Sequence, residues 1–136
     1  MAKVFTKKVV IPGNKIAEYF QALEETQEEI EPFREQLTEL NKEFEQHLIA
    51  KFSKRTARKH CYKIALFIDF LCWDTDVKNI DEITRGIANS YFRKWYMGKV
   101  GDCMESELKT AMKKFFQFLD SEKGITNDAV LKSFKR

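Results

Sequence analysis

The residues best suited to chemistry in this chain are cations that crowd together shortly before its midpoint. They are Lys54, Arg55, Arg58, Lys59 and Lys63, with no acid among them. Ser53 precedes them and is a typical N-cap, so the cations would occupy the first turns of a helix. A helix N-terminus carries partial positive charge, and its free N–H groups suit a phosphate oxygen. The segment therefore predicts an anion-binding surface, with an ordinary solvated basic face as the alternative.

Patterns typical of catalysis or metal binding do not occur in the sequence. It contains no Gly-rich phosphate loop, no GxSxG elbow and no HExxH. Its two histidines, His47 and His60, fall on helical segments and offer little for a nucleophile–base arrangement. Cys61, Cys72 and Cys103 form no CxxC pair and have no metal-ligand spacing. We expect no enzyme, metal, cofactor or small-molecule substrate, and reduced cysteines in a cytoplasmic protein.

Length and composition favour one helical domain. The chain has 136 residues, with 12 Phe but only 5 Gly and 2 Pro, which suits packed helices better than a turn-rich β architecture. No run approaches the roughly 20 apolar residues that span a bilayer, and the N-terminus is too polar for a secretory signal, so we expect no membrane partner. Residues 1–50 carry a net charge of −4 and residues 51–136 carry +7. This basic half is compatible with nucleic acid without demanding it.

The N-terminal segment predicts an arm followed by acidic helices. Residues 1–13 alternate as in a strand, which would have no partner within the chain, and end at Pro12. Apolar residues then recur every seven positions, at Ile16, Leu23, Ile30, Leu37 and Phe44. The first four predict a partner helix or homodimer contact, and the alternative is a helix folded back on its own domain. Because proline lacks an N–H, we expect one helix to end before Pro32 and another to run to about Lys51.

Four more helices are predicted downstream, at about 53–74, 81–98, 102–123 and 128–134. Their expected N-caps are Ser53, Asp81, Asp102, and Thr126 or Asn127, and their expected stops include Gly98 to Gly101 and Gly124. An aromatic stripe in the second of them comprises Tyr91, Phe92, Trp95 and Tyr96. Helical spacing favours a place in the core for this stripe, with Trp95 or Tyr96 at an edge, over stacking on bases.

Short motifs from residue 36 to residue 125 occur in a familiar order. They are Phe44, Leu48 and Ser53-x-x-Thr56; Tyr62, Phe67, Phe70 and Leu71; Ile80-Asp81-Glu82-Ile83-Thr84; Phe115-Phe116-x-Phe118-Leu119; and Glu122-Lys123-Gly124-Ile125. In this order and spacing the region resembles the SAM-like N-terminal core-binding domain of phage-integrase-type tyrosine recombinases. The resemblance implies an all-α fold, a four-helix SAM-like orthogonal bundle, here preceded by an extra acidic N-terminal helix. The implied divisions are 1–31, 32–125 and a short basic helix at 126–136.

The resemblance also implies binding of duplex DNA through backbone phosphates, with little or no sequence preference. The implied contacts are Ser53, Lys54, Arg55, Thr56, Arg58 and Lys59, together with Lys109 and Lys113 on the last bundle helix. That helix departs from the family pattern because Asp102, Glu105 and Glu107 begin it and would repel phosphate. No counterpart of the recombinase catalytic domain follows Arg136, so we expect a recombination-related module that binds DNA without cleaving it. The alternative function is a helical interaction or oligomerisation module that uses the acidic helices.

Overall fold

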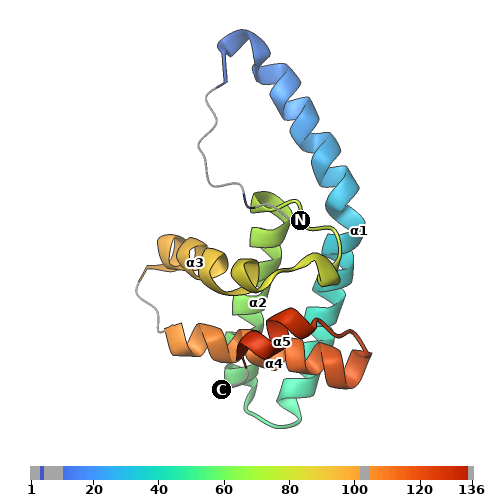
Figure 1. Ribbon diagram of the computed structural model, residues 1–136, viewed down its shortest axis with the longest axis vertical. Helices are drawn as coiled ribbons and strands as arrows, with labels where there is room; N and C mark the ends of the chain where they lie inside the picture. Colours follow the sequence, from blue (N-terminus) through green and yellow to red (C-terminus); the bar gives the residue numbers. More distant parts are fainter. Residues whose placement is uncertain (1–3, 5–10, 102–104, 135–136) are drawn as a thin grey trace.

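The computed structural model describes residues 4, 11–101 and 105–134, and the regular elements among them are all helices (Figure 1). The α-helices are α1 (Ile16–Ile49), α2 (Lys54–Asp74), α3 (Phe92–Val100), α4 (Glu105–Lys123) and α5 (Asp128–Phe134). Short helices are η1 (Gly13–Lys15), η2 (Ile80–Glu82) and the π-helix η3 (Ile87–Tyr91). The predicted all-α class is confirmed.

The long helices α1 and α2 form an antiparallel pair, and α4 and α5 cross it at the end where α1 meets α2 (Figure 1). Aromatic side chains join the layers. Phe44 of α1 is fully buried, with its ring centroid 5.3 Å from that of Phe115 on α4. The ring centroid of Phe67 on α2 lies 4.9 Å from that of Phe92 on α3. One continuous core therefore includes side chains from every α-helix, α5 among them.

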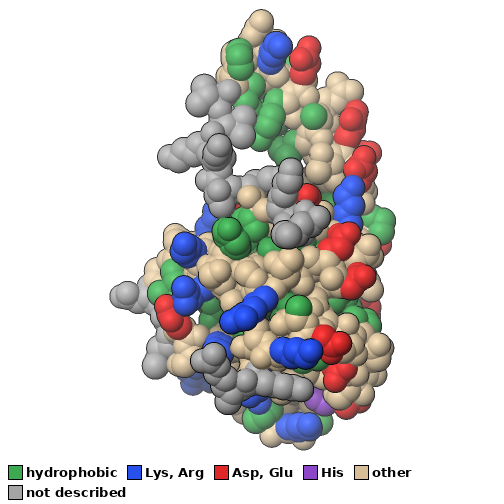
Figure 2. Space-filling view, in the orientation of Figure 1, with side chains coloured by type: hydrophobic (Ala, Val, Ile, Leu, Met, Phe, Trp, Pro, Cys, Tyr) green, Lys and Arg blue, Asp and Glu red, His purple; other side chains and the backbone are tan. Residues whose placement is uncertain are grey.

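Charge is segregated over this fold. Figure 2 shows Asp and Glu side chains following α1 along one edge, whereas Lys and Arg gather over the face formed by α3, α4 and α5. The pattern follows the sequence, in which the first 50 residues are net acidic and the remainder net basic. The acidic and basic surfaces thus belong to different helices.

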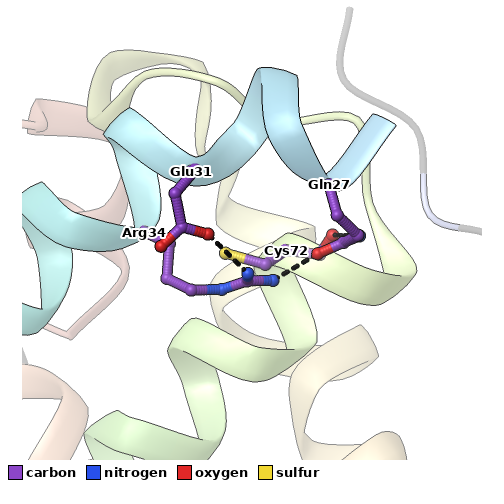
Figure 3. Close-up of polar contacts among 4 residues, drawn as sticks. All are labelled: Gln27, Glu31, Arg34 and Cys72. Carbon is purple, nitrogen blue, oxygen red and sulfur yellow. Dashed lines mark hydrogen bonds and ion pairs between the residues drawn. The ribbon is translucent and has the colours of Figure 1, made fainter. Parts of the chain in front are cut away.

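The predicted break at Pro32 is wrong, because α1 runs through this residue without interruption. Buried side chains hold the helix against α2 on both sides of it, Ile30 before and Phe33 after. Polar contacts reinforce the same stretch (Figure 3). The Arg34 guanidinium donates to Gln27 and, at 3.0 Å, to Glu31, while Gln27 donates to the Cys72 carbonyl at 3.3 Å. Tertiary packing thus outweighs the missing hydrogen bond of one exposed proline.

The helix predicted from Asp81 begins later. Asp81 lies in η2, and the next helix starts after Thr84, whose hydroxyl accepts from the Ile87 N–H at 3.2 Å. The helix continues through Gly98 and ends at Gly101, where φ is +79° and favours glycine.

Other predicted helix ends agree with the structure. Helix α1 ends at Ile49, close to the predicted end at about Lys51, and α2 ends at Asp74 as predicted. Gly124, with φ of +66°, ends α4, and the Asn127 side chain caps α5 by accepting from Val130. Val4, in the predicted arm, forms an isolated antiparallel bridge with Thr75, so it does have a partner within the chain. Residues 1–3 and 5–10 of the predicted arm, the Asp102 cap and Cys103 lie outside the described residues.

Candidate phosphate-binding surface

The N-terminus of α2 has the capping geometry that the sequence predicts. Ser53 Oγ accepts from the Thr56 backbone N–H at 3.1 Å and lies 3.0 Å from the Thr56 hydroxyl, to which it donates. Both predicted DNA contacts therefore take part in the cap. The backbone N–H groups of the first helical residues, Lys54 and Arg55, have no partner within a helix and point out of its end.

Four predicted contact residues share the exposed face of α2: Lys54, Arg55, Arg58 and Lys59. Their spacing of one, three or four residues places them side by side along two turns. Within residues 11–101 and 105–134, none of the four forms an ion pair. Their charges are available to an anionic partner.

Lys63, the fifth predicted cation, is far less exposed than the other four but still lines a shallow hollow with Arg55, Arg58 and Lys59. Its side chain is only 9% exposed, and its Nζ donates to the Lys59 carbonyl at 3.4 Å. Lys63 follows Lys59 by one helical turn, so it lies at the edge of the cationic face, next to the side that packs against the core. Lys63 as a DNA contact therefore stays a prediction, with much less exposed surface than the other four cations.

Tyr62 is a potential site residue that the sequence reasoning missed. The sequence motif groups it with the hydrophobic residues Phe67, Phe70 and Leu71, but its side chain is 59% exposed and lines the same shallow hollow as the cations Arg55, Arg58, Lys59 and Lys63. Its spacing of three and four residues from two of these cations could have revealed the shared face. An exposed ring among cations is suited to contact with a sugar or base beside a bound phosphate.

A cation from α4 joins the same end of the molecule. Lys114 Nζ lies 4.8 Å from the ring centroid of Phe52, the residue before the Ser53 cap. The pKa of His60 reflects these positive charges. It is lowered below 6.5, mainly by burial and then by the charges of Lys114 and Lys63, whereas the charge of Glu107 acts in the opposite direction. We call the five residues Lys54, Arg55, Arg58, Lys59 and Lys114 the α2 basic cluster.

The predicted contacts Lys109 and Lys113 lie elsewhere on α4. Lys109 lines a pocket with Arg85 and Lys132, and Lys113 is half-buried. Two acids at the start of α4 have cationic or titratable neighbours. A Glu105 carboxylate oxygen lies 3.8 Å from Arg93 Nη1, and the charge of Glu107 partly offsets the lowering of the His60 pKa. The structure therefore does not bring Lys109 into the hollow lined by the α2 cations.

The predicted oligomerisation residues are divided between core and surface. Ile30 and Leu37 are 4% and 2% exposed and pack in the core, so they cannot form an intermolecular contact, and that part of the prediction is wrong. Ile16 is exposed and Leu23 is half-buried on the half of α1 that projects beyond the other helices (Figure 1). Tyr19 and Phe20 are exposed on the same projecting half.

The cysteines and the aromatic stripe largely follow expectation. Cys61 and Cys72 are free and buried, and burial raises the pKa of the Cys61 thiol to about 12. A thiol in this state is a poor nucleophile. In the aromatic stripe, Phe92 and Tyr96 are buried and Trp95 lies half-buried at the edge of the core, as predicted, whereas Tyr91 is exposed.

No helix within the described residues is long and apolar enough to cross a membrane. The described residues also bring together no group of three or more His, Cys, Asp or Glu side chains that could hold a metal ion. Comparisons with protein-family models, curated proteins and solved structures found no match. The resemblance to recombinase core-binding domains thus remains a prediction from sequence.

Proposed function

We propose that this chain binds duplex DNA through backbone phosphates, with little or no sequence preference and without catalysis, in the reducing cytoplasm. The observation that carries the proposal is the set of four exposed cations at the N-terminus of α2, none of which forms an ion pair with another described residue. Such a cluster costs stability beside the positive end of a helix dipole, and an anion would relieve this cost. Free N–H groups in the first turn add donors for phosphate oxygens.

Two further features support DNA as the source of phosphate. The cluster extends to Lys114 on a second helix, so several phosphates of one backbone can be contacted. Tyr62 lies among the cations, where it can pack against a sugar or base. The sequence resemblance to core-binding domains favours a duplex and a role related to DNA recombination or integration, whether in a stand-alone module or part of a larger recombinase.

The test is the salt dependence of binding. If about five cations each displace a counterion, log K should fall with log salt at a slope of roughly −4 to −5. Fluorescence anisotropy with a generic duplex of about 30 base pairs, at low salt and at about 0.2 M, measures this slope. Replacing Lys54, Arg55, Arg58 and Lys59 together with Ala should abolish most of it.

The control for this experiment removes the same charge from another surface. Lys15, Lys42, Lys78 and Lys99 are exposed and lie away from the hollow lined by the α2 cations. Replacing these four lysines with Ala should leave the slope largely unchanged. A quadruple α2 variant that stays folded and binds the duplex as well as the parent would refute the assignment.

A second candidate function, dimerisation, is favoured by the exposed apolar residues of the projecting half of α1. Tyr19 and Phe20 are 38% and 56% exposed, with their ring centroids 5.8 Å apart. We expect Tyr19→Ser with Phe20→Ser to convert a dimer to a monomer in sedimentation velocity, whereas the exposed control Val100→Ser should not. A monomeric parent chain at high concentration would exclude this candidate.

A further inference from the structure

A second basic surface lies where η3, α4 and α5 meet, on the face that Figure 2 presents. It is a pocket of about 560 Å³ whose polar lining comprises Arg85, Lys109, Lys132, Asn89, Ser90 and Ser133. The three cations come from segments more than twenty residues apart in the sequence. The described residues that line the pocket include no acid.

Hydrogen bonds fix the walls of this pocket. Asn89 Nδ2 donates to the Arg85 carbonyl and to Ser133 Oγ, both at 2.9 Å, so η3 is tied to α5. The buried Asn127 amide donates to the carbonyls of Ile80 and Ile83 at 2.8 and 2.9 Å, which anchors the start of α5 against the loop before η3. The cations therefore project from a pre-formed framework, and η3 is a π-helix, an irregularity frequent at functional sites.

The charges in the pocket are not neutralised by the protein. In the described part of the chain, Arg85, Lys109 and Lys132 form no ion pair. The hydroxyls of Ser90 and Ser133 donate to backbone carbonyls, so the cations are the main free donors. Three positive charges around one pocket repel each other, and the attraction of each to a bound, multiply charged anion would offset that repulsion. Arginine with two lysines is a typical phosphate-binding set.

A smaller pocket of about 190 Å³ adjoins the first and shares Asn89 and Lys109 with it. Its apolar floor is formed by Leu108, Met112 and Phe134, and its lining also includes Arg93 and Glu105, which form an ion pair with an N–O distance of 3.8 Å. The cationic pocket thus lies beside a smaller one that combines apolar side chains with an internal ion pair, and the volume of the larger pocket falls in the range of small-ligand sites. This pairing suits a phosphate joined to a ring.

We propose that the pocket formed by Arg85, Lys109 and Lys132 binds a phosphate monoester of a nucleotide. The phosphate lies among the three cations, and the sugar or base contacts the adjoining apolar floor. The phosphate can belong to a free nucleotide or to the end of a nucleic acid strand, since the recognising chemistry is the same. The site shares no residue with the α2 basic cluster and does not depend on it.

Two titrations of the full chain test the pocket and distinguish the two sources. The first follows binding of AMP, with adenosine as the ligand without phosphate, by isothermal titration calorimetry. The second compares 5′-phosphorylated and 5′-hydroxyl duplexes of the same sequence by anisotropy. Arg85→Gln with Lys132→Gln is the pocket variant, Lys109→Gln is an independent second variant, and Lys15→Gln with Lys99→Gln, at exposed positions outside both pockets and the α2 basic cluster, is the charge-matched control.

AMP binding that adenosine does not share, weakened at least about tenfold in the pocket variant and kept in the control, supports the proposal with a free nucleotide as ligand. A preference for the 5′-phosphorylated duplex that only the pocket variants lose supports it with a strand end as ligand. The proposal is overturned if millimolar AMP and the 5′-phosphate both have no effect, or if the control loses the same binding.

Discussion

At the scale of single residues, similar side chains take different roles because of small differences in position. Arg58 and Lys59 face solvent, whereas Lys63, one turn further along α2, is buried and donates to a backbone carbonyl. His60 lies at the boundary of these two environments, with a buried Nδ1 that has no hydrogen-bond partner among the residues that the structure describes. Its neighbours Lys114 and Lys63 disfavour the imidazolium, and so does burial.

His60 should therefore make folding stability depend on pH. Its pKa in the folded state is lowered below 6.5, so the unfolded chain binds more protons as the pH falls below that value. Stability should be highest above about pH 6.5 and decline as the pH falls toward the folded-state pKa. Urea titrations across this range should show the decline in the parent chain and a weaker decline in His60→Gln.

His47 provides the control for this prediction, because it is the other histidine of the chain. His47→Gln should keep the dependence on pH below 6.5 that the parent shows. Identical pH profiles for the parent and His60→Gln would show that His60 does not contribute to it.

At the scale of elements, α1 combines a packed half with a projecting half. Its second half buries Phe33, Leu37 and Phe44, whereas its first half exposes Ile16 and Phe20. The Arg34 contacts lie near the transition, and the guanidinium also lies 5.8 Å above the Trp73 ring. The packed half and these contacts give the helix a fixed base from which its first turns extend.

Pro32 should be a weak point in this helix. Its side chain is exposed, and its missing N–H leaves the Glu28 carbonyl without the usual helical donor. Pro32→Ala should stabilise the fold by about 1–3 kcal/mol and raise Tm by several degrees in a thermal melt followed by circular dichroism. Glu35→Ala, an exposed change in the same helix, should shift Tm far less. A lower Tm for Pro32→Ala would show that the proline ring contributes packing of its own.

At the scale of the whole molecule, a single core joins the acidic and basic halves of the chain. α1 runs without interruption across the predicted boundary at residue 31, and α5 buries Val130 and Phe134 in the core it shares with the other helices. Phe44 links α1 to α4, with its ring centroid 5.3 Å from Phe115 and 5.5 Å from Phe118. We therefore expect the acidic helix and the basic bundle to unfold together.

Phe44→Ala tests this cooperativity. Removal of a fully buried phenyl ring should cost about 3–5 kcal/mol and lower the unfolding midpoint while keeping one transition. Phe20→Ala, at a position that is 56% exposed, should change stability by only about 0.5 kcal/mol. Denaturant unfolding followed by both tryptophan fluorescence and circular dichroism gives the comparison. Separate transitions by the two probes would contradict a single core.

The sequence by itself determined the features that depend on neighbouring residues. The Ser53 cap, the apolar stripes of α2 and α4 and the stop at Gly124 follow from local hydrogen bonding, helical periodicity and backbone freedom. Most of the α2 basic cluster was evident for the same reason, since four of its five members lie within two turns of one helix.

Only the tertiary structure decided the features that depend on packing between distant segments. The passage of α1 through Pro32 and the burial of Lys63 follow from contacts between helices. The addition of Lys114 to the cluster and the grouping of Arg85 and Lys132 around Lys109 have the same origin. No local pattern contains this information, because the free energy that places these side chains comes from the burial of apolar surface elsewhere in the fold.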